Sequence, residues 1–429
     1  MAEEPGTVGT ELRRLRTAAG LSLAELARRV HYNKGYLGRI ETGEKPAGME
    51  VARRCDAALA ADGKLAALVA KARPPEPAVV PEAAPDGGVW VMSMGPDGSS
   101  NLVPMSRRDA LAMGAASVLA LSVGAPGNAA AAGQETTIAA FRALFEQTRR
   151  LGQTSSPSVV LPIVVAQTHA LRGLAGSAAA SSRAELLRLA ARYAEYAGWM
   201  TQEAGDERGA LWWTETAVEM ASAAGDAELS TYALIRRALI TLYREDAAGT
   251  IDLAQQALAG SRTPPRIRGL AALREAQGHA LACDYDRCRH ALDRAAGLLD
   301  TSDGQEIGPA SVSGTGMVAV VTGWCMHDLG RPAEAGEILD RQLALVSPEA
   351  RRVHARFGAR RALAYASGGE VDHACALAEQ AIESALLVDS ATVRTDLRRL
   401  ARTLTRWHTH PPVRELYPRL TAALRTPAV

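Results

Sequence analysis

The sequence lacks the short motifs on which most catalysis and export depend. Its 429 residues contain no GxSxG elbow, no Walker phosphate loop and no HExxH zinc motif. This removes the commonest signs of a hydrolase, an NTPase or a metalloprotease. Five cysteines without a CxxC pair are typical of reduced thiols in the cytoplasm, and the first residues lack the basic and apolar regions of a signal peptide. We therefore expect a cytoplasmic protein that is not an enzyme and holds no metal or cofactor.

Asparagine, phenylalanine and lysine are scarce: the chain has three Asn, three Phe and four Lys. Together with abundant Ala, Gly and Arg, this composition is typical of a GC-rich, actinobacterial genome. No Asn follows residue 134. Side-chain amides commonly clamp the backbone of a bound peptide, because they donate and accept hydrogen bonds together. Their absence favours a small molecule, a partner protein or self-association over a peptide as the ligand of the C-terminal part.

Positive charge is concentrated at the N-terminus. Residues 1–73 hold 13 basic and 9 acidic residues, whereas the remaining 356 residues hold 35 and 38. The first segment therefore has a net charge of +4 and the rest −3, an asymmetry that the whole-chain charge of +1 conceals. A basic segment of this kind indicates contact with nucleic acid. It also holds all four lysines of the chain: Lys34, Lys45, Lys64 and Lys71.

Residues 12–46 carry the most specific pattern in the chain. Ser22 and Glu25 have the spacing of a capping box, Asn33 suits the N-cap of a following helix, and Gly20 suits a helix end. Two short helices joined by a turn of three or four residues are the helix-turn-helix geometry, whose second helix enters the major groove. Apolar residues at helical spacing predict five helices in this head, at residues 7–19, 22–30, 34–42, 49–60 and 63–72.

The sequences GLSLAELA and YLGRIETG resemble the Cro/Xre (lambda-repressor-like) helix-turn-helix domain. The resemblance covers the head only, about a sixth of the chain, and implies sequence-specific binding to double-stranded DNA. Two departures concern the second helix of the motif. Lys34 stands where the family often has Gln, and Gly35 and Gly38 supply no side chain, so readout of bases must depend on Lys34 and Arg39.

The resemblance also implies roles for individual positions. Three positions fall where family members contact base edges: Lys34, Gly35 and Arg39. Four fall where they contact phosphates: Ser22, Asn33, Thr42 and Lys45. Two fall on a pair that often forms a structural salt bridge in the family: Arg16 and Glu41.

Residues 74–133 separate this head from the rest of the chain. Residues 74–105 are expected to form a Pro- and Ala-rich linker that contains a β-hairpin at 89–104, around a Pro-Asp-Gly turn. Residues 106–133 begin with Ser-Arg-Arg-Asp and continue without charge, which is similar to a twin-arginine export signal. The apolar part is shorter than the roughly 20 residues that span a bilayer, so a buried connecting helix is expected instead and no membrane contact.

Residues 134–429 are expected to be all helical and to repeat internally. The first residues of five aligned turns recur every 38–47 residues, which is longer than the tetratricopeptide period of about 34. The stretch 272–299 closely resembles one tetratricopeptide repeat. We expect five such hairpins, flanked by further helices, to stack into a superhelix with a concave face. The five turns begin at Gly205, Glu245, Cys283, Gly330 and Gly369.

Two further features of this body support a stacked arrangement and a ligand. Small residues recur five and twelve positions after most of the turns, which lets paired helices approach closely. Aromatic residues usually belong to the core, but a cluster near the first hairpins makes six of them candidates for contact with an effector: Tyr193, Tyr196, Trp199, Trp212, Trp213 and Trp324.

The sequence thus predicts an all-α transcription regulator with an Xre-type head, a linker with a short β-hairpin and a tetratricopeptide-like body. We expect the body to form a homodimer that reads a palindromic operator, and to bind a small-molecule, peptide or protein effector. The alternative is a tetratricopeptide interaction scaffold whose head no longer binds DNA.

Overall fold

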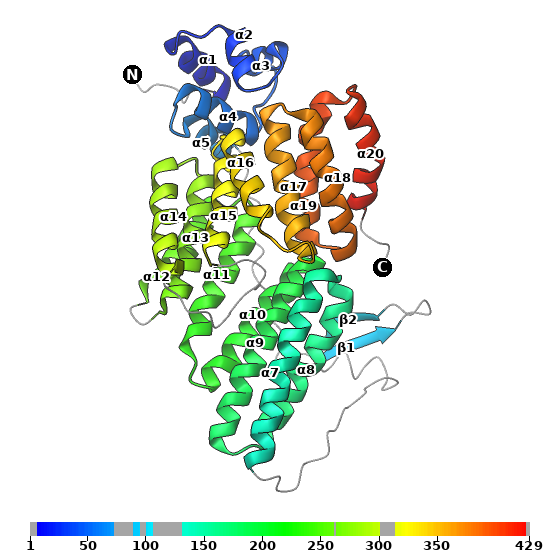
Figure 1. The fold of residues 1–429 in the computed structure, drawn as a ribbon. Coiled ribbons are helices and arrows are strands. Elements are labelled where there is room, and N and C mark those ends of the chain that lie inside the picture. The colour runs from blue at the N-terminus through cyan, green and yellow to red at the C-terminus, as the bar shows by residue number, and fades with distance from the viewer. Residues whose placement is uncertain are drawn as a thin grey trace.

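The computed structural model describes residues 7–72, 89–94, 100–105, 131–260, 263–300 and 314–425. A five-helix head occupies one end of a larger body of packed helices (Figure 1). The expected linker falls largely within 73–88 and the expected connecting helix within 106–130, and both stretches lie outside the described residues.

The head contains the five helices that the sequence predicts. Its core is formed by aliphatic side chains from every helix, among them Leu12, Leu26, Leu37, Val51 and Leu65, each at most 3% exposed. The helices are α1 (Val8–Ala18), α2 (Leu23–Arg29), α3 (Lys34–Glu41), α4 (Met49–Leu59) and α5 (Lys64–Ala72).

The only strands among the described residues form a two-stranded antiparallel sheet. Strand β1 (Val89–Met94) pairs with β2 (Ser100–Met105), with Val89 opposite Met105 and Met94 opposite Ser100. The sheet lies beside α8 (Pro157–Ser177), at the end of the body that is remote from the head (Figure 1).

The body consists of helical hairpins whose two helices pack antiparallel. It begins with α7 (Ala131–Thr154) and α8. Five hairpins follow: α9 (Ala180–Ala204) with α10 (Glu207–Ala223), α11 (Ala227–Tyr243) with α12 (Ala247–Ala259), α13 (Pro265–Leu281) with α14 (Tyr285–Asp300), α15 (Gly314–Asp328) with α16 (Pro332–Leu343), and α17 (Arg351–Gly368) with α18 (Val371–Val388). The described chain ends with α19 (Ala391–Leu404), the short η1 (Thr405–Trp407) and α20 (Pro411–Leu424).

All five predicted turns join the two helices of a hairpin. The first residue of each turn has a left-handed backbone, with φ between 59° and 97°. Glycine adopts this conformation freely, whereas Glu245 and Cys283 must accept some strain there. The small residues that follow each turn by five positions are fully buried between the paired helices, as the repeat predicts: Ala210, Thr250, Cys288, Ala335 and Ala374.

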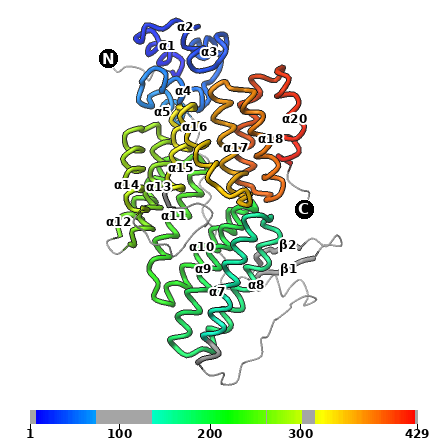
Figure 2. The backbone as a smooth tube through the Cα atoms, viewed as in Figure 1, coloured from blue at the N-terminus to red at the C-terminus, as the bar shows by residue number. Residues whose placement is uncertain are grey.

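The superhelix closes on itself instead of presenting an open concave face. Arg352 of α17 donates from Nε to the carbonyl of Gly152 in α7, at 2.7 Å, and from Nη1 to Glu203 Oε2 in α9, at 2.8 Å. Glu203 also accepts hydrogen bonds from Ser390 and Thr392 at the start of α19. These buried contacts bring the last hairpins back against the first helices, as the backbone trace shows (Figure 2).

By length and apolar composition alone, one helix among the described residues, α8, is able to cross a membrane. Three of its apolar side chains, Val160, Val164 and Leu171, are fully buried in the core of the first hairpins. The composition of α8 is therefore also that of a core helix in this body.

Candidate nucleic-acid interface

The recognition element of the head is α3, which is positioned by the turn that precedes it. Asn33 caps the helix, since its Oδ1 accepts a hydrogen bond from the backbone N–H of Gly35 at 2.7 Å. Leu37 and Ile40 face inward and are at most 1% exposed. Lys34 and Arg39 consequently lie on the outer face of α3, where both are exposed.

Helix α2 holds the other half of the motif in place. The Ser22 hydroxyl accepts from the N–H of Glu25 at 3.2 Å, and the N–H of Ser22 donates to Glu25 Oε2 at 2.8 Å. This capping box satisfies donors at the helix start that would otherwise lack partners. His31, with φ of 56°, lies in the tight turn that leads from α2 to α3.

Arg16 and Glu41 form the ion pair that the family resemblance implies. Arg16 Nε lies 2.7 Å from Glu41 Oε1, and Nη2 lies 2.9 Å from Oε2. Arg16 Nη1 also donates to the carbonyl oxygen of Leu21 at 2.8 Å. Because the pair is bidentate and nearly buried, it fixes the end of α3 relative to α1.

The residues expected to contact phosphates surround α3 and are exposed: Ser22, Asn33, Thr42 and Lys45. The Lys45 ammonium lies 4.8 Å from the centre of the Tyr36 ring, which orients it along the helix. The Thr42 hydroxyl donates to the carbonyl of Arg39 at 3.2 Å and so caps the end of α3. The three expected base-contacting positions lie in α3, Asn33 and Thr42 cap that helix, and Ser22 caps α2.

The head docks on the body through α4, a contact that the sequence did not reveal. Buried Arg54 donates from Nη1 to Val30 O at 2.9 Å within the head, and from Nη2 to the carbonyl of Ser367 in the body. Arg406 of the body donates to Glu50 Oε1 at 2.9 Å, and its guanidinium stacks 4.4 Å from the centre of the Tyr32 ring.

Three successive hairpin turns of the body meet the head at van der Waals distance. A Cβ added to Gly330 would lie 2.8 Å from the carbonyl oxygen of Arg53, and one added to Gly369 would lie 2.7 Å from His31 Nδ1. On the head side, a Cβ added to Gly63 would lie 2.7 Å from Cys283 Cβ. Because these approaches leave no room for a side chain, the head is held closely and in one orientation.

A groove of about 990 Å³ lies between the head and the C-terminal part of the body. Asn33 and Lys34 line it from the head, and Arg402, Arg406 and Trp407 line it from the body. Basic residues of the body are therefore placed beside the start of the recognition helix.

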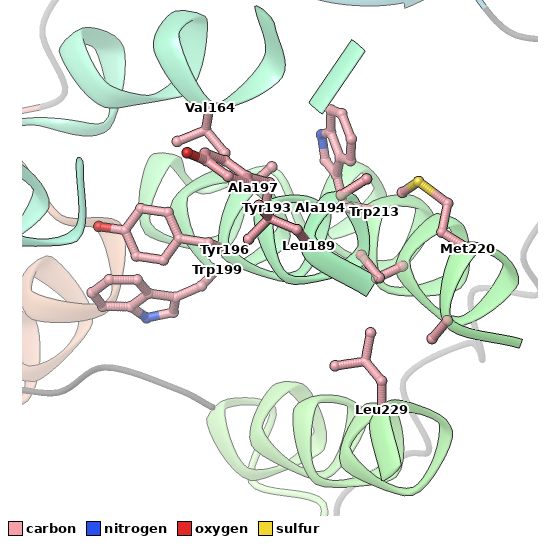
Figure 3. Close-up of a cluster of buried hydrophobic side chains, with 14 of the residues drawn as sticks. Val164, Leu189, Tyr193, Ala194, Tyr196, Ala197, Trp199, Trp213, Met220 and Leu229 are labelled. Atoms are coloured by element: carbon pink, nitrogen blue, oxygen red, sulfur yellow. The ribbon is translucent and has the colours of Figure 1, made fainter. Parts of the chain in front are cut away.

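The six aromatic candidates for an effector site divide into two groups. Tyr193, Tyr196 and Trp213 lie in the core of the first hairpins, at most 3% exposed (Figure 3). Trp212 packs against that core. The Tyr193 hydroxyl donates to the carbonyl of Phe141 at 2.8 Å. These rings fill space between helices, so none of these four lines the internal pocket of the body. The remaining two, Trp199 and Trp324, do line that pocket.

The same pocket is also lined by arginines, which the sequence did not single out. One signal was available: Arg352, Arg356 and Arg360 follow one another at intervals of four residues on α17. Like charges at this spacing share one helix face and repel each other, so such a row requires nearby partners.

Comparison with known proteins identifies the head. A family model described as a helix-turn-helix domain matches residues 7–69, so these residues are a helix-turn-helix domain. No curated protein matches the chain. A solved structure described as "Crystal Structure of Rap Protein Complexed with Competence and Sporulation Factor" is similar over 68% of this chain and 95% of that chain, at 14% identity and a TM-score of 0.41.

Proposed function

We propose that the protein is a cytoplasmic transcription regulator that binds specific double-stranded DNA through α3, without catalytic activity of its own. The observation that carries this proposal is the helix-turn-helix domain at residues 7–69, with the polar face of α3 exposed and its apolar face in the head core. An exposed second helix of this motif is the element that enters the major groove.

Lys34 and Arg39 make the base contacts in this proposal, and Gly35 lets the helix backbone approach the bases. Arginine and lysine donate to the O6 and N7 acceptors of guanine, so the operator contains guanine at these positions. Ser22, Asn33, Thr42 and Lys45 contact phosphates and fix the head on the duplex.

We further propose that the operator is a palindrome read by a homodimer. A single small head buries too little surface for tight specific binding. Two heads related by a two-fold axis read half-sites about one helical turn apart, or a multiple of it. The helical body provides the large surface on which two copies associate, and the docked head gives each copy a fixed orientation.

The test is selection of DNA from a random duplex library by the full chain, followed by measurement of affinity and stoichiometry. Enrichment of a guanine-containing palindrome bound by two chains supports the proposal. Weak binding with the same affinity for all sequences contradicts it, and assigns the protein to interaction scaffolds instead.

A further inference from the structure

A partly open pocket of about 100 Å³ lies inside the superhelix and is lined by helices α7, α9, α11, α13, α15 and α17. Its walls combine aromatic rings and guanidinium groups, and none of the lining residues that the structure describes carries a carboxylate. The rings belong to Trp199, Tyr232, Trp324 and Phe357. The guanidinium groups belong to Arg236, Arg266, Arg274, Arg352 and Arg356, and we call this space the arginine pocket.

Two of these arginines have carboxylate partners behind the pocket wall. Arg352 pairs with Glu203, as described above, and Arg236 Nε lies 3.4 Å from Glu195 Oε1. Within the described part of the chain, no carboxylate lies within ion-pair distance of the other three, and their Nε atoms are buried without a hydrogen-bond partner: Arg266, Arg274 and Arg356. Burial, and to a smaller extent the neighbouring charge of Arg356, lower the pKa of Arg274 to about 10.

A guanidinium inside a protein loses its hydration, and neighbouring groups offset only part of this cost here. Arg274 donates to Gln277 Oε1. Burial opposes ionisation of Arg356, but the charges of Tyr243, Glu203 and Asp396 raise its pKa. The rings beside Arg356 offset part of this cost, since its guanidinium lies 5.6 Å from the centre of the Tyr243 ring and 5.4 Å from that of Trp324. A bound anion would offset the rest, because the planar fork of arginine matches carboxylate and phosphate oxygens.

We propose that the arginine pocket binds a small organic anion. The carboxylate or phosphate group of this anion lies against Arg274 and Arg356, and the planar, apolar part of the anion lies against Tyr232 and Trp324. The pocket volume of about 100 Å³ is below that of the cavity of about 150 Å³ that holds a benzene ring, so the charged group lies inside the pocket and the planar part extends toward its open side.

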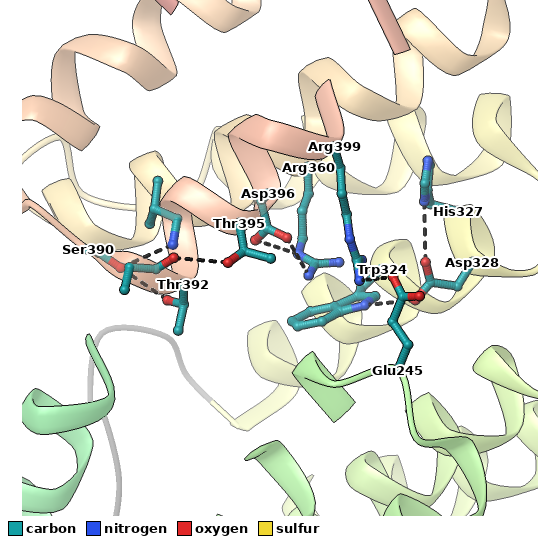
Figure 4. Close-up of polar contacts among 12 residues, drawn as sticks. Glu245, Trp324, His327, Asp328, Arg360, Ser390, Thr392, Thr395, Asp396 and Arg399 are labelled. Atoms are coloured by element: carbon teal, nitrogen blue, oxygen red, sulfur yellow. Dashed lines mark hydrogen bonds and ion pairs between the residues drawn. The ribbon is translucent and has the colours of Figure 1, made fainter. Parts of the chain in front are cut away.

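A short chain of contacts joins the arginine pocket to the head. Trp324 donates from Nε1 to Asp328 Oδ2 at 2.9 Å (Figure 4). Asp328 Oδ1 lies 3.8 Å from Nη1 of Arg53 in α4. Burial opposes ionisation of Asp328, but the hydrogen bond with His327 and the charge of Arg53 hold its pKa well below the usual range. A ligand that moves Trp324 therefore moves a charged partner of the docked head.

The binding itself is independent of the proposed DNA-binding function, whereas its regulatory effect rests on that function. A ligand changes DNA affinity only if it binds differently to two arrangements of the head and body. We expect the anion to favour one geometry of the contact between Asp328 and Arg53.

The first experiment is calorimetric titration of the full chain with phenyl phosphate, benzoate and phthalate, with benzyl alcohol as a neutral control. We expect one anion to bind per chain, and Arg274→Gln or Arg356→Gln to weaken it roughly tenfold or more, since each removes a charged hydrogen bond. Arg268→Gln is the matched control, because Arg268 lies on the same helix and is exposed. The proposal would be overturned if none of the three anions bound, or if the Arg274 and Arg356 variants bound the anion as tightly as the wild type.

A second experiment needs no ligand. Arg274→Met removes a buried charge that repels Arg356, so we expect the unfolding midpoint of the full chain to rise in anion-free buffer. A purely structural role for Arg274 predicts a fall instead, and a fall would overturn the proposal.

The third measurement separates this inference from the proposed function. Operator affinity is measured with and without saturating phenyl phosphate, in the wild type and in Asp328→Asn. A change in the wild type that is lost in the variant supports coupling through Asp328, and an unchanged affinity contradicts it. Anion binding by a chain that binds no DNA sequence specifically would contradict the proposed function and leave the anion site standing.

Discussion

The head and the body both carry positive charges that form no ion pair with a described carboxylate, but those of the head lie on its surface and those of the body line a pocket. Lys34, Arg39 and Lys45 are exposed and form no ion pair within the described part of the chain. Arg274 and Arg356 line the partly open pocket of the body. Exposed charges bind a polyanion through many contacts, and dissolved salt weakens each of them. Charges that line a pocket interact strongly with one small anion at short range. Location, more than residue type, therefore separates the two proposed ligands.

The largest effect is expected where the body balances its internal charge. Glu203→Gln removes the carboxylate that accepts hydrogen bonds from Arg352, Ser390 and Thr392. Breaking one side of a buried pair leaves the other charge uncompensated, so the free energy of unfolding should fall by about 3–5 kcal/mol. Urea unfolding followed by circular dichroism measures this change.

The matched control for that variant is Glu207→Gln, which breaks an exposed ion pair with Arg244. An exposed pair contributes about 1 kcal/mol or less. If both variants lost the same free energy of unfolding, the contacts of Glu203 that close the superhelix would stabilise the fold no more than a surface ion pair does.

The next largest effect concerns the contact between the two regions. Arg54→Ala removes the buried guanidinium that joins Val30 in the head to Ser367 in the body. Hydrogen bonds to a charged group contribute about 1.5–3 kcal/mol, so amide exchange in α4 and α5 should accelerate by a corresponding factor. Arg29→Ala, at an exposed position of the head, should leave exchange unchanged. Unchanged exchange in the Arg54 variant would show that the head is not held by this contact.

The sequence was sufficient for features that depend on neighbouring residues. The capping box of Ser22 and Glu25, the Asn33 cap and each of the five hairpin turns are local features. In each of them, the residues that interact are separated by only a few positions in the sequence. Their hydrogen bonds form locally, so the residue types alone predict them. The charge asymmetry between head and body was likewise a property of the sequence.

The features that the sequence did not reveal join residues far apart in the chain. Arg352 reaches Gly152 across 200 positions, and Arg54 reaches Ser367 across 313. Local periodicity contains no information on such pairs. The aromatic cluster shows the same limit. An aromatic residue such as Tyr193 or Trp213 can belong to a core or to a ligand site, and only the positions of the neighbouring helices show that these two belong to the core.

The charges of the head are tested by two substitutions with different signatures. Arg39→Ala removes a proposed base contact, and we expect it to weaken operator binding by about 1–3 kcal/mol and to relax preference at one base pair. Measured against operators that carry each base at that position, the variant should lose discrimination. Retained discrimination would contradict the assignment of Arg39 to the bases.

Lys45→Ala removes a proposed phosphate contact. It should weaken binding to all duplexes alike and reduce the slope of log affinity against log salt concentration by about 0.9, the value for one released counterion. A loss of affinity that depends on the DNA sequence would show that Lys45 contacts the bases and not the phosphates. The titration is repeated at several salt concentrations with the operator and with an unrelated duplex.

The smallest expected effect asks whether the two regions act together on DNA. Arg402 is exposed on the body and lines the groove beside Lys34. If the head stays docked on the operator, Arg402 lies close to the DNA backbone, and Arg402→Ala should lower affinity by less than Lys45→Ala and independently of sequence. The docking contact provides the control, because Arg54→Ala frees the head from the body. In that background the effect of Arg402→Ala should vanish, so the two substitutions are not additive. Additive losses would mean that Arg402 reaches DNA without the docked geometry. No loss in either background would mean that the head leaves the body before it binds.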